Sequence, residues 1–532
     1  MSTTPSTVRI RWDWIVLLLI VGGGILRFLA LGQQSYWVDE IRSVIIATGG
    51  PQGKWVFAAL NIHGPLHLVL LKIWMLLFGN SEAATRSLSA IFGLMALPLF
   101  YRVAAPMIGR RAALLGLALL AVSPFHLWYS QEARNYAMLF DAALLAIPIY
   151  LWEIERRSRL SFLAALAISV VACLTNLAGF FILALYGLFA VLRLPRGYPF
   201  WRPLFLMVLT ALLLSPWIAN AVTQLGAVHL GRPQGISGED VIVRGESPAG
   251  VLSIPFTFYI FSLGFSQGPS IHDLKMHHWA VVKPFLPYLV PVLLLFGVIA
   301  LRGLRSLLRR SVPHHSPPLG HAPILVLWLF VPLLLMLLIS MINLKAPNPR
   351  YAIVSFAPFV MLLGLGLATL RPAWVRAAVT SVLLLVSLHS VYHYFTNPYY
   401  WRPDGRAVGA LLDRESTPSD IAVSCGVPEP LELYAPNHLF VFQRPPRGTF
   451  AEPDVLRGWL HAATAGKERL WYVKIDSWWG DPAHRLLRGC QELLIPDGDW
   501  QFEKAEVHRF RVPPAWREQH PVEGPSPPGL RP

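Results

Sequence analysis

Charged residues are scarce in this chain of 532 residues, at 14%, whereas hydrophobic residues make up 54%. A soluble domain does not need so much apolar surface, so the composition excludes an ordinary water-soluble enzyme. Apolar runs close to the ~20 residues that cross a bilayer recur along the sequence. The sequence therefore indicates a polytopic membrane protein.

Cysteine is also scarce, with three residues in the whole chain. Three cysteines are too few for a disulfide framework or a zinc cluster, and their spacing fits no metal motif. The formal charge of +15 would favour nucleic-acid binding in a soluble chain. Here the arginines lie in short loops between apolar runs, where they hold those loops in the cytoplasm. We therefore exclude nucleic acid as a partner.

The apolar runs predict an α-helical fold with about eleven transmembrane helices. Arg9 and Arg11 precede the first run in the manner of a signal peptide, but the many later spans favour an uncleaved first span with a cytoplasmic N-terminus. The predicted spans are residues 14–31, 87–107, 112–129, 136–152, 160–175, 177–194, 203–220, 284–301, 322–342, 351–370 and 373–395.

The number of crossings decides the position of one short apolar segment, residues 65–79. It has only roughly 15 residues and carries His67 and Lys72, so it is short for a crossing and we interpret it as an interfacial helix. With that assignment every strongly basic loop lies on the cytoplasmic side, as the charge rule requires, whereas a crossing would move two of these loops outside. These loops contain Arg102, Arg110, Arg111, Arg156, Arg157, Arg159, Arg193, Arg196, Arg202, Arg302, Arg305, Arg309, Arg310, Arg371 and Arg376.

The same topology brings the unusual polar stretches together on the outer face. Polar groups that converge at one membrane surface define a site, whereas scattered groups would be ordinary loop residues. The stretches are residues 37–43 (WVDEIRS), 61–67 (NIHGPLH), 129–136 (YSQEARNY), 343–351 (NLKAPNPRY) and the long loop 221–283.

The composition changes after residue 395. Residues 405–412 have a helical pattern, 420–426 and 469–475 are typical of short buried strands, and 500–512 alternates as edge strands do. We therefore expect a membrane domain over residues 1–395 and a small extracytoplasmic α/β domain over 396–512. Residues 513–532, rich in Pro, Gly and charge, are predicted to be a disordered tail.

Adjacent carboxylates in the stretch QQSYWVDEIRS are the first candidates for catalysis. Asp39 and Glu40 follow the first span directly, and charge at a membrane boundary is costly unless it is solvated, paired or used. A carboxylate there can take a proton from a hydroxyl nucleophile, provided that partial burial raises its proton affinity without neutralising it. The alternative is structural: Asp39 pairs with Arg42, and the rings of Tyr36 and Trp37 belong to the aromatic belt at the interface.

The other outer stretches supply cations that suit a phosphate. Arg134 can hold a phosphate through a forked pair of hydrogen bonds, and Glu132 and Tyr136 lie beside it in sequence. The alternatives are a local surface pair between Glu132 and Arg134, structural interfacial histidines, and snorkelling basic anchors. The further candidates are His63, His67, Lys345, Arg350 and Tyr351.

Four motifs occur in order along the chain: SYWVDEIRS, HGPLHLVLLKIWMLLFGNSEAATRSLSAIFG, SPFHLWYSQEARNYAMLF and NPRYAIVSFAPF. As a set they resemble the bacterial branch of the GT-C glycosyltransferases related to protein O-mannosyltransferases and lipid A aminoarabinose transferases. The resemblance covers residues 10–395. It implies many spans with interfacial helices in the first outer loop, a polyprenyl-phosphate-linked sugar as donor, and inversion at the anomeric carbon.

By the same resemblance, Asp39 matches the acidic motif of the first outer loop and His63 a phosphate-facing residue before a proline. Arg86 matches an arginine that opens the next span, and Arg134 the basic residue of the second outer loop. The chain departs from the family at His63-Gly64-Pro65, where His-Pro-Pro is usual, and at Asn176-Leu177, where His-Tyr is frequent.

The sequence thus predicts an integral glycosyltransferase of the bacterial inner membrane. It would transfer mannose or another hexose or pentose from a polyprenyl-phosphate donor to a protein, lipid or glycan acceptor on the extracytoplasmic face. Asp39 acts as base in this reading, no cofactor is required, and Asp39 with Glu40 could hold Mg²⁺ or Mn²⁺. The alternative is a lipid-linked sugar flippase or polysaccharide transporter, which predicts mid-span charges and matched broken helices. Arg27 is the plainest mid-span charge.

Overall fold

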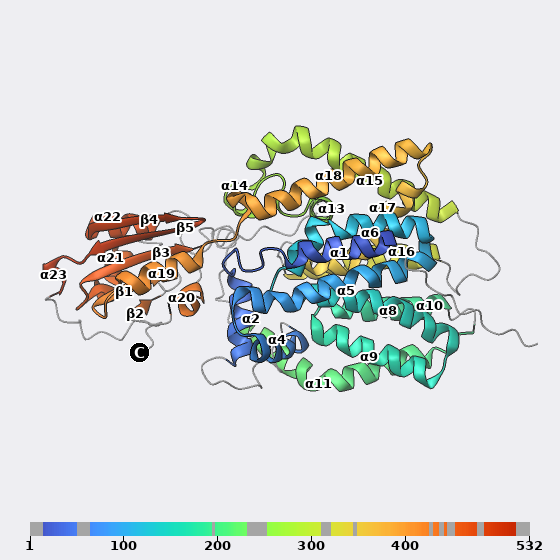
Figure 1. The fold of residues 1–532 in the computed structure, drawn as a ribbon. Coiled ribbons are helices and arrows are strands. Elements are labelled where there is room, and N and C mark those ends of the chain that lie inside the picture. Colours follow the sequence, from blue (N-terminus) through green and yellow to red (C-terminus); the bar gives the residue numbers. More distant parts are fainter. Residues whose placement is uncertain are drawn as a thin grey trace, which may run out of the picture.

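Apolar helices make up the chain as far as Thr396, and a small sheet domain follows (Figure 1). This computed structural model describes residues 14–49, 64–193, 197–230, 253–309, 321–343, 348–424, 429–435, 441–443, 453–475 and 484–517. The sheet domain lies at one end of the helical bundle, and we call this end the site end (Figure 1).

The helices of the bundle differ in length and in their fitness to cross a membrane. They are α1 (Trp14–Phe28), α2 (Val38–Thr48), α4 (Pro65–Phe78), α5 (Glu82–Ile108), α6 (Arg110–Ala121), α7 (Pro124–Ser130), α8 (Tyr136–Arg156), α9 (Arg159–Thr175), α10 (Gly179–Arg193), α11 (Trp201–Leu230), α13 (Ser253–Leu263), α14 (Ile271–His277), η3 (His278–Phe285), α15 (Leu286–Arg309), α16 (His321–Asn343), η4 (Pro349–Ser355), α17 (Phe356–Ala368), α18 (Ala373–Thr396) and η5 (Pro398–Tyr400).

Within the described residues, seven helical segments are long and apolar enough to span a membrane. An eighth span results if α6 and α7, which meet at a bend of 58°, count as one. The chain is therefore a multi-pass membrane protein. The predicted spans coincide with apolar helical segments, except that residues 112–129 are broken into α6 and α7. Helices α1, α9 and α10 are apolar but shorter than the segments long enough to cross.

Two helices at the site end do not have the character of spans. Helix α2 runs across the ends of the long helices in Figure 1. Helix α4 has 14 residues, or about 21 Å at 1.5 Å per residue, which is short of the ~30 Å hydrocarbon core. The sequence did not predict α13, which lies inside the supposed outer loop, nor the extension of α11 to Leu230.

Helix α17 is the centre of the bundle, with nearly all its residues buried between α6, α15 and its other neighbours. Small residues permit the close approach. A Cβ on Gly366 would come within 2.0 Å of the Ile299 carbonyl oxygen, and one on Gly364 within 2.3 Å of the Ala112 carbonyl oxygen. Close backbone contact at small residues is how helices associate in lipid, where apolar burial gives little drive.

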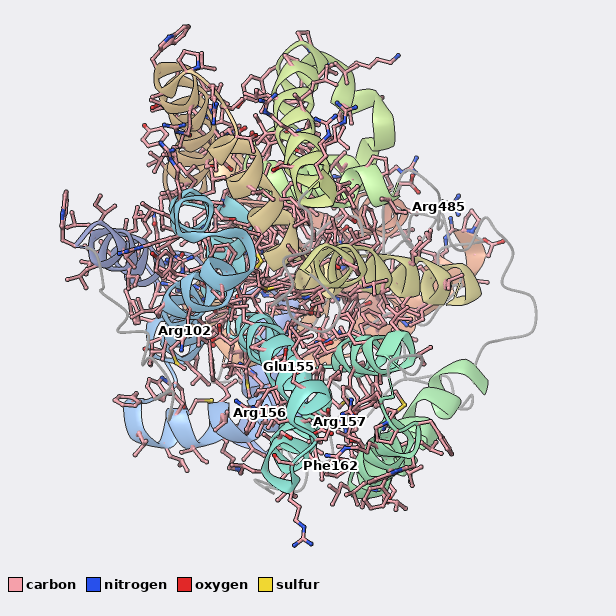
Figure 2. The ribbon with its side chains drawn as sticks, turned by 90° about the vertical axis from the view of Figure 1, so that its right-hand side faces the viewer. Arg102, Glu155, Arg156, Arg157, Phe162 and Arg485 are labelled. Atoms are coloured by element: carbon pink, nitrogen blue, oxygen red, sulfur yellow. The ribbon has the colours of Figure 1, made fainter. Side chains whose placement is uncertain are left out.

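Basic side chains lie at the end of the bundle opposite the sheet domain. Figure 2 views the molecule from that end and labels the exposed Arg102 of α5 and Arg156 and Arg157 at the end of α8. These residues belong to the loops that the charge rule predicts to be cytoplasmic.

The sheet of the small domain has the strand order β2-β1-β3-β5-β4. Strand β1 pairs in parallel with β2 and β3, and β5 pairs antiparallel with β3 and β4. Helices cover both faces: α21 and α22 pack on the side of Ile421 and Val423, and α19 and α20 on the side of Ala422. The elements are α19 (Gly405–Glu415), β1 (Asp420–Ser424), α20 (Glu429–Tyr434), β2 (Val441–Gln443), α21 (Pro453–Thr464), β3 (Arg469–Ile475), α22 (Arg485–Leu493), β4 (Ile495–Phe502), β5 (Ala505–Arg511) and α23 (Pro514–Arg517).

Two expectations for this domain were wrong in detail. Residues 500–512 form the end of β4 and all of β5, and β5 lies inside the sheet because β3 pairs with its other side. The predicted disordered tail begins with a short helix, α23, in which the Trp516 ring contacts His461 at a ring-centre distance of 4.7 Å. Residues 518–532 lie outside the described part of the chain.

Candidate active site

The candidate residues lie at the site end of the bundle and come from separate segments. The first turn of α2 supplies Asp39 and Glu40, and the bend between α7 and α8 supplies Glu132 and Arg134. Tyr136 begins α8, and Arg350 and Tyr351 lie in η4.

Asp39 faces two arginines that are far from it in sequence. Its Oδ2 atom accepts a hydrogen bond from Arg350 Nη1 at 2.5 Å, and each of the two side chains is 18% exposed. Arg134 Nη1 donates to the backbone carbonyl of Asp39 at 3.2 Å and to the Ser43 hydroxyl at 2.8 Å. The carboxylate and both cations therefore form one cluster, which we call the open cluster.

The charge of Asp39 is set by these neighbours. Burial alone would raise the pKa of its carboxyl, but Arg350 and Arg134 outweigh burial and hold the pKa below its usual value, with a smaller effect from Arg42. Asp39 is consequently ionised at neutral pH. Its proton affinity is lowered by the two arginines, contrary to the expectation that burial would raise it.

Unused hydrogen-bond donors surround the open cluster. Within the described residues, the Nε atoms of Arg134 and Arg350 and the ring nitrogens Trp37 Nε1 and His67 Nε2 are buried without a hydrogen-bond partner. Such groups are costly to bury unless a ligand or ion uses them. Burial, with a contribution from Arg134, lowers the pKa of His67 to about 3, so this imidazole is neutral near pH 7.

Aromatic rings line the same cluster. The Arg350 guanidinium carbon lies 5.1 Å from the ring centre of Tyr351, 5.8 Å from that of Tyr136 and 6.0 Å from that of Trp37. Arg134 lies 5.8 Å from the ring centre of Tyr136. These distances permit cation–π contacts that hold the two guanidinium groups in place.

Glu40 has a different environment from its neighbour Asp39. Its side chain is fully buried and accepts from Arg86 Nε at 2.8 Å, from Arg86 Nη2 at 2.9 Å and from the Ala133 backbone N–H at 2.9 Å. Arg402 Nη1 donates to Glu40 Oε2, the oxygen that also accepts from Arg86 Nη2. Burial would raise the pKa of Glu40, but Arg402 and Arg86 outweigh it and lower the pKa.

Arg86 also makes its hydrogen bonds with groups of the protein. Besides its pair with Glu40, it donates to the backbone carbonyls of Leu31 and Gln34, each at 2.8 Å, and of Ser35 at 3.0 Å. Glu132 is also fully buried; its Oε1 accepts from Trp128 Nε1 at 2.6 Å and from Arg402 Nη2 at 3.2 Å. We call Glu40, Arg86, Glu132 and Arg402 the closed cluster.

Burial raises the pKa of Glu132 to about 7, and the Glu40 carboxylate adds to this rise, whereas Arg402 opposes it. The carboxyl of Glu132 therefore changes charge near neutral pH. Its Oε2 atom has no hydrogen-bond partner among the described residues.

The structure resolves two alternatives that the sequence left open. Arg42 pairs with Glu429 of the sheet domain at 2.7 Å, while the Asp39 carboxylate bonds to Arg350. Glu132 and Arg134 are both buried, so they do not form the exposed surface pair. His63 and Lys345 lie outside the described residues.

Sequence reasoning missed Arg402, which follows the last span in the stretch NPYYWRPDG. An arginine among aromatic residues just after a span was the available signal, but it equally suits an interfacial anchor. The roles of Trp37 and Ser43 beside the open cluster were also missed, because neither residue type implies a site.

The two acidic side chains do not fit a divalent cation. Asp39 is paired with Arg350, and both oxygens of Glu40 already accept hydrogen bonds from arginine. No group of three or more His, Cys, Asp or Glu side chains is placed to hold a metal ion in the described part of the chain. Mg²⁺ and Mn²⁺ prefer several free carboxylate or carbonyl oxygens, so we derive no step through a metal.

The mid-span charge Arg27 has a structural partner set. It is fully buried and donates to the carbonyls of Ala121 at 3.0 Å and Leu120 at 3.1 Å, where the break between α6 and α7 frees them. Gln131 Nε2 in turn donates to the Leu29 carbonyl, at the end of α1, at 2.8 Å. The Arg27 guanidinium thus supplies hydrogen bonds to the backbone carbonyls that the helix break leaves without partners, as is required of backbone groups inside a membrane.

Comparisons with known proteins identify the fold. No protein-family model and no curated protein sequence matches the chain. Among solved structures, it is similar to ArnT from Cupriavidus metallidurans in the apo state, with 15% identity, a TM-score of 0.58 and coverage of 95% of this chain and 99% of that one.

The same protein bound to undecaprenyl phosphate matches with 14% identity, a TM-score of 0.56 and the same coverage. The oligosaccharyltransferase AglB from Archaeoglobus fulgidus, in complex with an inhibitory peptide and a dolichol-phosphate, matches with 12% identity and a TM-score of 0.50 over 93% of this chain and 74% of that one. At such low identity these likenesses establish the fold. The chain has the polytopic GT-C fold.

Proposed function

We propose that this protein is an integral-membrane glycosyltransferase that moves a sugar from a polyprenyl-phosphate donor to an acceptor hydroxyl. The observation that carries the proposal is the open cluster. It joins an ionised carboxylate, Asp39, to two arginines with unused donors at one end of a GT-C fold. A base beside a phosphate-binding site is what glycosyl transfer from a lipid phosphate requires.

The residues divide the work of the reaction. The acceptor oxygen attacks the anomeric carbon, its proton passes to the Asp39 carboxylate, and the bond from the anomeric carbon to the phosphate oxygen breaks. The pair of electrons leaves with the polyprenyl phosphate. Arg134 and Arg350 stabilise the charge on this leaving group, and the Nε2–H tautomer of His67 can donate to it. Attack opposite the leaving group inverts the anomeric carbon.

The neighbours in fold support a lipid phosphate as donor. One solved structure holds ArnT with undecaprenyl phosphate, and another holds AglB with a dolichol-phosphate and a peptide. A donor of this kind keeps its chain in the bilayer and places its phosphate at the membrane surface, which suits a cationic cluster at the ends of the spans. The acceptor class we propose is a protein, lipid or glycan hydroxyl.

The charge distribution supports an extracytoplasmic site in the inner membrane of a bacterium. Arg102, Arg156 and Arg157 lie at the end opposite the site (Figure 2). Basic loops stay in the cytoplasm, so the site end and the sheet domain face outward and the N-terminus faces inward.

Within this proposal Glu40 and Arg86 take a structural role instead of the catalytic and substrate-binding roles that the sequence suggested. Both oxygens of Glu40 accept hydrogen bonds from arginine, and Arg86 donates to one carboxylate and three carbonyls. A substrate would have to displace these buried bonds, at a cost of several kcal/mol.

Transport without chemistry receives less support. A transporter predicts a matched pair of broken helices and mid-span charges that face a pathway. In the described residues, α6 and α7 are the one pair of helices that could form a single broken span. Arg27 at the break is fully buried and donates to carbonyl groups.

The test is a transfer assay with protein in lipid vesicles and a panel of radiolabelled polyprenyl-phosphate sugars. Wild-type protein should release polyprenyl phosphate and label an acceptor fraction, whereas Asp39→Asn should not. Asp273→Asn is the matched control, because Asp273 is a carboxylate of the outer loops that bonds to Tyr399. Movement of intact labelled lipid across the vesicle, without release of polyprenyl phosphate, would favour transport and overturn the proposal.

A further inference from the structure

Arg402 belongs to the peptide that connects the last span to the sheet domain, between η5 and α19. It is nonetheless buried, with 6% of its surface exposed. Its two terminal nitrogens reach different carboxylates: Nη1 donates to Glu40, and Nη2 donates to Glu132 at 3.2 Å. The guanidinium carbon lies 5.3 Å from the ring centre of Trp128. One side chain thus joins the first and the second outer loops.

Arg402 compensates the charge of Glu132 whenever that carboxyl is ionised. Glu40 and Glu132 are both fully buried, and Arg86 pairs with Glu40 alone. Arg402 forms an ion pair with Glu132 at 3.2 Å. Loss of one partner from a buried charge set leaves an uncompensated group, which then shifts its protonation or moves.

The peptide around Arg402 is fixed to the first outer loop by further contacts. The Arg402 backbone N–H donates to Gln34 Oε1 at 3.3 Å, and the Ser35 hydroxyl donates to Asp404 at 2.7 Å. Arg406 donates to the Gly32 carbonyl at 3.1 Å and pairs with Glu82 at 3.1 Å. The entry to the sheet domain therefore lies along the segment that leads into α2.

We propose that Arg402 is a positioning residue for the base, which makes the connection to the sheet domain part of the active site. This inference rests on the proposed function. Asp39 and Glu40 are successive residues of α2, and successive side chains project about 100° apart around a helix. Because Glu40 is fixed to Arg86, Arg402 and Ala133, the rotation of α2 is fixed, and Asp39 is directed at Arg350.

The second outer loop is positioned by the same residue. Glu132 accepts from Arg402, the next residue donates its backbone N–H to Glu40, and Arg134 then reaches Asp39 and Ser43. Asp39 and Arg134 are thereby held in fixed positions relative to each other. Holding reacting groups to within about 0.5 Å is what supporting residues contribute to catalysis.

The simpler explanation is that Arg402 only docks the sheet domain. The two explanations differ in what a matched substitution does. Arg406 lies four residues along the same connection and also contacts the bundle, but it bonds to Gly32 and Glu82 and not to the closed cluster. A docking role would make the two arginines equivalent, whereas a positioning role would not.

The experiment compares Arg402→Gln, Arg402→Lys and Arg406→Gln in the transfer assay, with thermal unfolding of each purified protein. We expect Arg402→Gln to lower kcat by roughly 10- to 100-fold, the scale of an ångström-level misplacement. The donor KM should change less than kcat, because Arg134 and Arg350 remain. Arg402→Lys should recover part of kcat, since it keeps the charge but cannot reach both carboxylates as a fork does. Arg406→Gln should leave kcat within about twofold of wild type, as expected for a partly exposed pair.

Equal losses in Arg402→Gln and Arg406→Gln, or a normal kcat in Arg402→Gln, would overturn the inference while wild-type activity upholds the proposed function. An inactive wild-type protein with every donor would instead contradict the proposed function itself. If Arg402→Gln does not fold, Arg402→Lys carries the test. Failure of both to fold would assign Arg402 to stability and overturn the positioning role.

Discussion

The open and closed clusters are both built from carboxylates and arginines, yet their adjacent carboxylates Asp39 and Glu40 have different environments. In the closed cluster both oxygens of Glu40 accept hydrogen bonds from the protein and the side chain is fully buried. In the open cluster Asp39 is partly exposed, and Arg134 and Arg350 keep buried Nε donors without a partner in the described residues. The Glu40–Arg86 pair makes its hydrogen bonds within the protein and stabilises the fold, whereas Arg134 and Arg350 keep donors that are available to a substrate. In the closed cluster, Glu132 Oε2 and Arg402 Nε are likewise buried without a partner in the described residues.

The largest effect that would sharpen this comparison is predicted for Glu40→Gln. The substitution removes the charge that compensates Arg86 and Arg402, and removing one partner of a buried pair costs about 3–5 kcal/mol. We expect a large loss of folded protein and a lower unfolding temperature in detergent. A Glu40→Gln protein that unfolds at the wild-type temperature but has lost transfer would break the division between the clusters.

A smaller but still large effect is predicted for the two arginines of the open cluster, which we propose to bind the donor phosphate. Arg134→Ala and Arg350→Ala should each lower kcat/KM by roughly 10- to 100-fold, since a hydrogen bond to a charged group is worth about 1.5–3 kcal/mol. Donor binding should weaken together with turnover, because a phosphate contact serves both ground and transition states. Steady-state kinetics over donor concentration measures both.

Arg156→Ala is the control for these two variants, because Arg156 is exposed at the opposite end of the bundle. It should behave as wild type. An unchanged donor KM in both Arg134→Ala and Arg350→Ala would show that the open cluster does not bind the donor phosphate.

A shift of the pH profile should follow from the charges around Asp39. Arg350, Arg134 and Arg42 lower the pKa of this carboxyl against the effect of burial. The base works when ionised, so activity should persist as the pH falls and decline only below the usual carboxylate range. Arg350→Gln removes a lowering charge, so the pKa rises and the acid limb of kcat/KM moves to higher pH. An acid limb that stays in place would show that another group sets it.

The smallest effect is predicted for Arg42→Gln. Arg42 pairs with Glu429 across the junction with the sheet domain, but its side chain is 49% exposed. Exposed pairs contribute about 0–1 kcal/mol, so transfer and unfolding temperature should change little. A large loss of activity would restore Arg42 as the partner of Asp39.

Much of the fold could be predicted from the sequence because lipid imposes a strong apolar signal. The predicted spans coincide with helical segments, except that residues 112–129 form two helices, α6 and α7, and β3 was predicted at its observed bounds, Arg469–Ile475. Helix α13 was missed because it has only 11 residues, fewer than a crossing needs. The buried position of β5 was missed because its alternating pattern does not show which strands pair with it.

The site could be located from the sequence but not divided into its two clusters. Topology placed Asp39, Arg134 and Arg350 on one face, and the structure brings them together. The sequence shows Asp39 and Glu40 only as two adjacent carboxylates. The geometry of α2 directs them to different arginines. Arg402 lies 362 residues after Glu40 in the sequence, and no local pattern predicts their contact.

The proposed role of Asp39 as the base can be measured by single-turnover transfer with Asp39→Asn. The variant keeps the shape of the side chain but cannot take the proton, so the chemical step should slow by roughly 100-fold or more. Donor affinity, measured on the same folded protein by titration, should remain because the arginines that hold the phosphate are intact. Transfer by Asp39→Asn at the wild-type rate, with normal donor binding, would contradict the claim.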